Sequence, residues 1–146
     1  MLGPYYRLIV YYTGIKDAVY NSGARIEAHW IPWKLSEGAL VQGSEESDTT
    51  AFLNTGETAT VGDVLLGTVV DNRKDMYMGF TGTFYFKASE TLTNYPLGLY
   101  LEQSTDNSRW PSGQADFNVQ LHCHKLCDLQ KEISGLDPIA MNFFYS

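Results

Sequence analysis

Two histidines and two cysteines lie close together in the segment NVQLHCHKLC, Asn118–Cys127. Thiolate and imidazole are the donors that zinc prefers, so the cluster raises the question of a metal site. Alternating polar and apolar residues predict a strand from Ala115 to Cys123, and successive side chains of a strand point to opposite faces. We therefore expect Cys123 to be buried in the core, away from the two histidines, so that the four donors do not converge on one ion.

His122 and His124 share the other face of this predicted strand. They would hold a metal only with a third ligand from a neighbouring strand, and the plainer interpretation is a pair of solvent-facing histidines. A disulfide between Cys123 and Cys127 needs Cα atoms closer than about 7 Å, whereas four residues of extended chain span about 13 Å. We expect two free thiols, no cofactor, and no metal, with His122 and His124 as the remaining metal candidates.

Catalytic chemistry has little support in the sequence. The chain contains no G-x-S-x-G nucleophile motif, no phosphate-binding glycine loop and no pair of cysteine knuckles. Its 17 acidic residues offer many carboxylate pairs, but none lies in a segment whose pattern implies the buried cleft of a glycosidase. His29, beside Trp30, is expected to be a half-exposed strand residue rather than a general base. The sequence predicts a protein that is not an enzyme.

Short alternating segments separated by Gly, Asn, Asp and Ser run through most of the chain. The clearest is Met76–Ser89, in which Met, Phe and Ala alternate with Tyr, Thr and Lys. The one helical signal is Cys127–Ser134, with Leu129 and Ile133 four residues apart and Gly135 directly after it. The same alternation predicts further strands at Tyr5–Tyr12, Ala24–Trp33, Thr50–Asn54, Gly62–Val70, Leu97–Ser104 and Ala115–Cys123.

This pattern predicts a single all-β domain over residues 1–146, an antiparallel β-sandwich of jelly-roll or immunoglobulin-like topology with at most one short helix near the C-terminus. The acidic segment Glu37–Asp48 is expected to be an exposed loop or an edge hairpin. A net charge of −7 argues against nucleic-acid binding, which needs clustered Lys and Arg. Two cysteines make no disulfide framework, and no stretch approaches the roughly 20 apolar residues of a membrane helix. We expect a soluble protein that folds in a cytoplasm.

The aromatic content is high for one modest core, with 10 tyrosines and 3 tryptophans. Trp30 and Trp33 have opposite parity, so one should be buried while the other faces outward. Tyr77 and Tyr85 lie on the polar face of the longest predicted strand, and Trp110 lies in a long loop. Exposed rings of this kind stack on sugars, anchor protein interfaces or pack across strands of a half-exposed sheet.

Both ends of the chain are apolar, at about residues 1–6 and 138–146. Left in water they would expose a sizeable patch, so they need a partner. The C-terminal tail is either a final strand of the same domain or an arm exchanged with a neighbouring subunit. The candidate interface residues of the chain are therefore Trp33, Tyr77, Tyr85, Trp110, Met141, Phe143, Phe144 and Tyr145.

A longer pattern extends over residues 56–121. It combines an outgoing strand and turn at Leu99–Asn107, a tip with Trp110 and Pro111, and a returning strand at Phe117–Leu121. In this respect the chain resembles the small β-sandwich structural proteins of tailed bacteriophages. The resemblance implies a virion protein assembled in the host cytoplasm: a capsid decoration or cement protein that stabilises the shell, or a small tail or adaptor subunit. Its implied partners are major capsid or tail proteins and copies of itself, with no direct nucleic-acid or membrane contact.

A different class of function follows from the aromatic residues alone. A β-sandwich with flat exposed rings is also typical of carbohydrate-binding, lectin-like modules. The stacking platform would then be Trp33, Trp110, Tyr77 or Tyr85, and the ligand would be a glycan.

Overall fold

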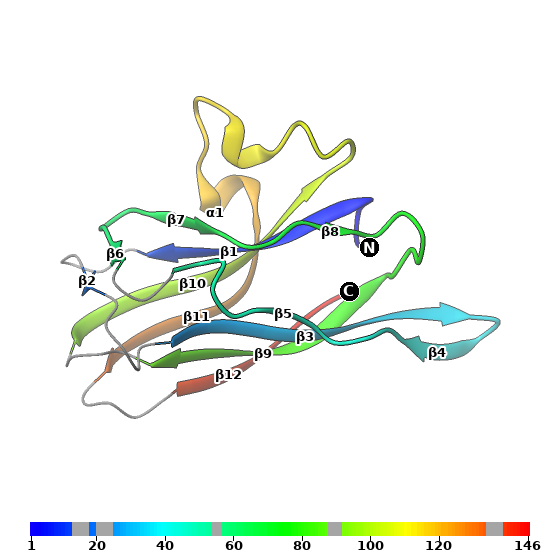
Figure 1. Cartoon of the computed structure of the whole chain (residues 1–146), viewed down its shortest axis with the longest axis horizontal. Helices are drawn as coiled ribbons and strands as arrows, with labels where there is room; N and C mark the ends of the chain where they lie inside the picture. Colours follow the sequence, from blue (N-terminus) through cyan, green and yellow to red (C-terminus); the bar gives the residue numbers. More distant parts are fainter. Residues whose placement is uncertain (13–17, 20–24, 54–56, 88–91, 134–138) are drawn as a thin grey trace.

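A computed structural model of the chain describes residues 1–12, 18–19, 25–53, 57–87, 92–133 and 139–146. Two antiparallel sheets pack face to face (Figure 1), which confirms the predicted all-β sandwich. The strands are β1 Tyr5–Tyr12, β2 Ala18–Val19, β3 Arg25–Ser36, β4 Ala39–Gln42, β5 Glu46–Asp48, β6 Thr58–Ala59, β7 Val64–Leu66, β8 Val70–Asp71, β9 Gly79–Lys87, β10 Leu92–Ser104, β11 His124–Ile133 and β12 Ile139–Tyr145. Two short helical turns, η1 Pro111–Gly113 and α1 Val119–His122, lie between β10 and β11.

The first sheet has the strand order β11-β10-β1-β7. β8 pairs directly with β1, on the same side as β7, at Tyr5 and Tyr6. β1 pairs with β10 along its whole length, from Tyr5 opposite Ser104 to Tyr12 opposite Leu97. The second sheet has the order β12-β9-β3-β4. β5 pairs directly with β3, on the same side as β4, at Ala28–Trp30. β2 and β6 form a separate small pair. The long strands β3, β9 and β12 thus build one continuous surface on the outside of the second sheet.

The core lies between the sheets and follows the period of two that the sequence shows. Alternate residues of β3 are buried, among them Trp30, whose indole N–H donates to the hydroxyl of Tyr6 at 3.2 Å. Phe80 and Phe84 of β9 are buried beside it. Trp33 is half-buried on the outer face, so the prediction that only one of Trp30 and Trp33 belongs to the core is confirmed.

The strand predicted for Ala115–Cys123 is wrong. Residues 119–122 form the single turn α1 instead, capped by the Asn118 side chain, which accepts from the backbone N–H of Gln120 at 3.0 Å. The turn lies on the outer face of the first sheet, where Val119 packs against Ile9 and Tyr100. An Asn that caps a turn takes the chain out of strand pairing, and Val119, with Phe117 and Cys123 beside it, packs the turn onto the sheet.

The helix predicted for Cys127–Ser134 is also wrong, because residues 124–133 form β11. Its backbone pairs with β10, a 13-residue strand whose other side is already paired with β1. Tertiary pairing of this kind overrides a weak helical spacing. The short helix near the C-terminus exists, but as α1.

Two further strand predictions need correction. Thr50–Phe52 form bends, although Phe52 is buried, and Asn54 lies outside the described residues. The segment Gly62–Val70 yields two short strands, β7 and β8, separated at Gly67. A side chain on Gly67 would come within 2.7 Å of the Leu8 carbonyl oxygen, so the close approach to β1 requires glycine there.

The acidic segment Glu37–Asp48 contains the edge hairpin that the sequence suggests. Glu37 and Gly38 form the turn between β3 and β4, with φ values of 52° and 79°, the signs that a tight two-residue hairpin turn needs. The C-terminal tail is the strand β12, which pairs with β9 of the same chain and buries Phe143 in the core. This arrangement is the first of the two alternatives for the tail, the final strand of its own domain.

Candidate functional site

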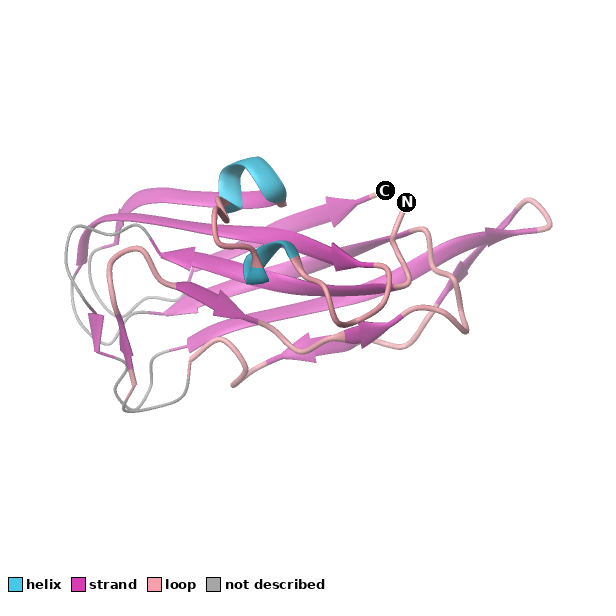
Figure 2. Cartoon of the chain, turned by 90° about the horizontal axis from the view of Figure 1, so that it is seen from above, coloured by secondary structure: helices cyan, strands magenta, loops and turns pink. Residues whose placement is uncertain are grey.

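The hairpin formed by β3 and β4 extends beyond the rest of the sandwich (Figures 1 and 2). Pairing of β3 with β9 stops at Trp33 opposite Gly79, whereas pairing with β4 continues to Ser36 opposite Ala39. Within the described residues, the tip therefore consists of β3 and β4 alone, without further strand pairing. Its apolar side chains remain in water, with Leu35 56% and Leu40 61% exposed.

These side chains continue a row that begins on the sandwich itself. Odd-numbered residues of β3 point to the outer face, and Leu35 lies directly opposite Leu40 in the hairpin. Trp33 lies in the middle, against Gly79, where a side chain would come within 2.7 Å of the indole. We call the row the apolar strip, and it consists of Ile31, Trp33, Leu35 and Leu40.

The base of the hairpin is braced by Tyr77. Its backbone N–H donates to the side chain of Asn72 at 2.8 Å, and its ring fills the space left by Gly43. Lys34 lies over the ring, with Nζ 5.5 Å from the centroid, and donates to the Asp75 carbonyl at 2.7 Å. Tyr77, a candidate interface residue, is thus half-buried and packs against the core at the base of the hairpin.

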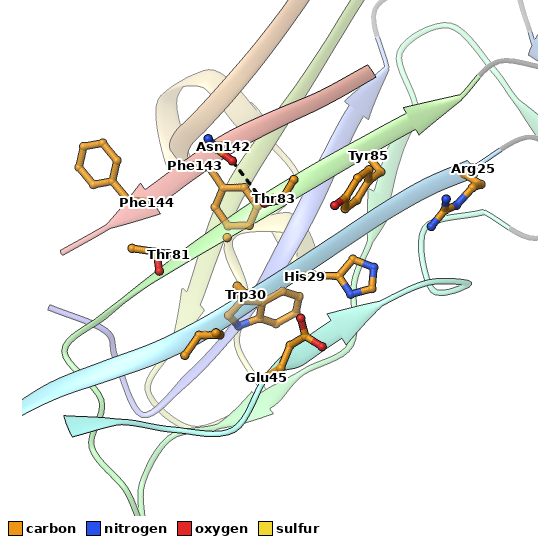
Figure 3. A pocket seen from close by; sticks show the side chains of 12 residues that line it. Arg25, His29, Trp30, Glu45, Thr81, Thr83, Tyr85, Asn142, Phe143 and Phe144 are labelled. Carbon is orange, nitrogen blue, oxygen red and sulfur yellow. Dashed lines mark hydrogen bonds between the residues drawn. The ribbon is translucent and has the colours of Figure 1, made fainter. Parts of the chain in front are cut away.

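A broad, shallow groove of about 930 Å³ lies on the outer face of the second sheet (Figure 3). Phe144 lies at one end and is 72% exposed, and Tyr85 lies at the other. Between them, Thr83 of β9 donates its hydroxyl to Asn142 of β12 at 3.3 Å. The groove combines one open aromatic ring with hydroxyl and amide groups, which is the chemistry of a site for a neutral polar ligand.

The charges at the Tyr85 end of the groove are matched to one another. Arg25 donates to Glu27, lies 5.5 Å from the Tyr85 ring centroid, and has its pKa raised by that carboxylate. The hydrogen bond from Arg25 lowers the pKa of Glu27. His29 Nε2 lies 3.3 Å from Glu27, and its ring meets Tyr85 edge-on at 5.8 Å. Arg25 and Glu27 thus neutralise each other at this end, whereas Glu45 adds a carboxylate to the lining of the groove.

Trp110 has a structural partner. Its ring covers the guanidinium of Arg7 at 4.3 Å, and its indole N–H donates to the Asn107 carbonyl at 3.2 Å. Arg7 in turn donates to Glu102 at 2.7 Å, a carboxylate that is only 1% exposed. One face of Trp110 thus shields a buried ion pair, and the ring also lines a shallow hollow of about 420 Å³ with His122.

The two histidines of the opening motif are held by different elements. His122 ends α1 and accepts the backbone N–H of Asn118 through Nδ1 at 3.0 Å, while its ring stacks on Phe117. His124 begins β11, and its ring lies 5.1 Å from that of Tyr145. The prediction that they share one face of a strand is wrong, because His122 belongs to the turn α1 and only His124 belongs to a strand. Within the described ranges no three His, Cys, Asp or Glu side chains are grouped to hold a metal.

Cys123 and Cys127 are free cysteines. Both are half-buried, whereas the alternation placed Cys123 fully in the core. Burial raises the pKa of Cys123 to about 12 and that of Cys127 to about 11. The thiols therefore stay protonated at neutral pH and are poor nucleophiles.

The four tail candidates occupy different environments. Phe143 is buried in the core, and Met141 and Tyr145 pack against it from the same side of β12. Phe144 points the other way, into the outer groove. Of the apolar strip, the sequence pattern singles out Trp33 but not Ile31, Leu35 or Leu40. The alternation of β3 continues past Pro32 to Leu35, and that continuation was the available signal.

Comparison of the chain with protein-family models, with curated proteins and with solved structures gave no match. In the part of the chain that the structure describes, no helix has the length and apolar character needed to span a membrane.

Proposed function

We propose that this chain is a non-enzymatic virion structural protein of a tailed bacteriophage, a capsid decoration or cement protein that stabilises the shell through subunit contacts. The observation that carries the contact function is the apolar strip on a braced, projecting hairpin. The sequence resemblance of residues 56–121 to phage β-sandwich proteins supports the virion setting, apart from its returning strand at Phe117–Leu121, where the chain forms the turn α1 instead. Other virion proteins, in particular the major capsid protein, are the proposed partners.

The physical argument rests on where the apolar surface lies. Leu35 and Leu40 pair across the hairpin but remain more than half exposed, so covering them would contribute a further part of the roughly 1.5–3 kcal/mol that full burial of a leucine supplies. Trp33, at the centre of the strip, is the residue type that most often dominates interface energies. A braced hairpin also loses little conformational entropy on binding. The net charge of −7 keeps such a subunit away from packaged DNA.

The test is co-sedimentation with virions. Particles carrying the wild-type chain, or particles depleted of it and then reloaded, are separated on a density gradient, and the bound copies are counted. Leu35→Ser with Leu40→Ser should reduce occupancy at least tenfold, because two apolar contacts are lost. Leu121→Ser is the matched control, since Leu121 is 79% exposed on α1, which covers the other sheet. Wild-type chain that stays at the top of the gradient would contradict the proposal.

The position of the chain on the particle distinguishes a capsid decoration protein from a tail or adaptor subunit. Labelling bound copies for electron microscopy should place them on the capsid surface, in many copies. Copies confined to the neck or tail would instead assign the chain as a tail or adaptor subunit, with the same hairpin as its contact.

The outer groove favours a second candidate, a carbohydrate-binding module for neutral glycans. The supporting observation is Phe144, an open ring at the end of a groove that offers hydroxyl and amide groups from Thr83 and Asn142. In titrations with neutral oligosaccharides of several linkages, Phe144→Ala should weaken binding at least tenfold, since stacking on an aromatic ring supplies much of such affinity. Leu66→Ala, an exposed residue on the other sheet, serves as the control. An absence of wild-type binding across the panel would exclude this candidate.

A further inference from the structure

The outer edge of β12 forms one border of the second sheet. β12 is the terminal strand of the second sheet and pairs with β9 through all seven of its residues, without a register shift. No other strand in the described ranges pairs with its second side. Every second backbone group along that side therefore lacks a strand partner, and such an edge is a template for another strand.

Natural edge strands carry devices that prevent such pairing, and the neighbouring edge of this molecule has them. β11, the terminal strand of the first sheet, contains Lys125 and Asp128, and its pairing with β10 shifts register between Leu99 and Tyr100. Charges and bulges of this kind block the addition of a strand. The remaining edges are formed by strands of two to four residues.

β12 has none of these devices. Its sequence is IAMNFFY, with no charged residue, no proline and no glycine, and its ladder is regular. An uncharged seven-residue edge with a regular ladder, beside an edge that carries charges and a register shift, is suited to pairing with a further strand. Within the described ranges the terminal strands of the two sheets therefore differ: β11 carries charges and a register shift, and β12 carries neither.

We propose that two copies of this chain associate through antiparallel pairing of β12 with β12, about a two-fold axis at Asn142. In this register Asn142 meets Asn142 of the second copy, and Ala140 lies opposite Phe144 of the second copy. The pairing sets a small side chain beside a large one on the outer face, and it occurs twice by symmetry. A self-complementary patch of this kind is what a two-fold interface needs.

The pairing explains the exposure of Phe144. That side chain is 72% exposed within one chain, and in the pair it packs over Ala140 of the second copy. The outer groove of one copy then continues into that of the other across the joined sheet. The inference does not rest on the proposed virion function, because the hairpin and the β12 edge are separate surfaces on opposite edges of the second sheet.

The first experiment measures mass in solution by sedimentation velocity over a range of protein concentrations. The wild-type chain should sediment as a dimer at micromolar concentration. Asn142→Lys should raise the dimer dissociation constant at least a hundredfold, because it sets two like charges side by side at the axis. Ser47→Lys is the control, since Ser47 is an exposed residue on β5 of the same sheet. A wild-type monomer at all concentrations, or a dimer unaffected by Asn142→Lys, would overturn the proposal.

The second experiment tests the register. Asn142→Cys should form an intermolecular disulfide under mild oxidation, since directly opposed residues of paired strands have Cβ atoms about 4.5–5.5 Å apart. Ala140→Cys should not, because the two substituted positions would be separated by about 13 Å along the strands. The wild-type chain shows the background from Cys123 and Cys127. Equal cross-linking of the two variants would overturn the proposed register.

Discussion

At the scale of single residues, the buried carboxyl group of Asp48 should make the free energy of unfolding depend on pH. Its carboxylate is 2% exposed and accepts the backbone N–H of Thr68 at 3.2 and 3.3 Å, yet burial raises its pKa. The native state then holds the proton more tightly than the unfolded state. The contribution of this group to the free energy of unfolding is therefore full below its unfolded pKa and is lost as the pH rises through the raised folded pKa.

Asp48→Asn removes this dependence while its amide oxygen still accepts from Thr68. Relative to Asp48→Asn, the wild-type chain should gain stability as the pH falls from 7 to 4. Urea unfolding midpoints of the two proteins across that range measure the difference. A difference that does not change with pH would refute the assignment to Asp48. The comparison between variants also cancels the opposite trend from carboxylates with lowered pKa values, such as Asp71 and Asp106.

The buried pair of Arg7 and Glu102 makes a second prediction at this scale. Arg7→Met leaves the 1% exposed Glu102 carboxylate without its cation, which typically costs about 3–5 kcal/mol. Trp110→Ala leaves the ion pair in place and removes the cover over the guanidinium and the hydrogen bond to the Asn107 carbonyl, so it should cost less, about 0.5–2 kcal/mol. Urea unfolding measures both values. Equal losses would mean that Trp110, rather than the ion pair, holds the segment over the first sheet.

At the scale of secondary-structure elements, the sequence predicts best where the alternation is long. Tyr5–Tyr12 is β1 to the residue, and β3 and β9 lie largely within the predicted ranges. The sequence predictions fail where tertiary contacts, rather than local pattern, determine the secondary structure. The alternation of residues 117–123 misleads because Phe117, Val119 and Cys123 pack around a capped turn while Leu121 is exposed. The weak helical spacing after Cys127 yields to pairing with β10. The apolar strip was missed because its partner strand β4 is four residues long and lies in an acidic stretch.

The difference between turn and strand at α1 is testable. In a strand, Val119 and Leu121 would share a buried face, but in α1 Val119 is buried while Leu121 is 79% exposed. Val119→Ala should lower the free energy of unfolding by about 1–2 kcal/mol, whereas Leu121→Ala should change it by less than about 0.5 kcal/mol. Chemical denaturation of the two variants measures these changes. A comparable loss of stability for both would support a strand, rather than a turn, at residues 119–122.

At the scale of the whole molecule, the apolar strip and the β12 edge divide the proposed contacts between two opposite edges of the second sheet. A dimer joined at β12 carries two hairpins, so its attachment to a repetitive surface gains avidity, commonly 10²–10⁴-fold when both sites can be reached. Asn142→Lys should therefore weaken binding to assembled particles, yet leave binding to one isolated partner subunit unchanged. Leu35→Ser with Leu40→Ser should weaken both and leave the dimer intact. Surface plasmon resonance on particles and on single subunits separates these outcomes, and an equal effect of Asn142→Lys on both would show that β12 touches the partner itself.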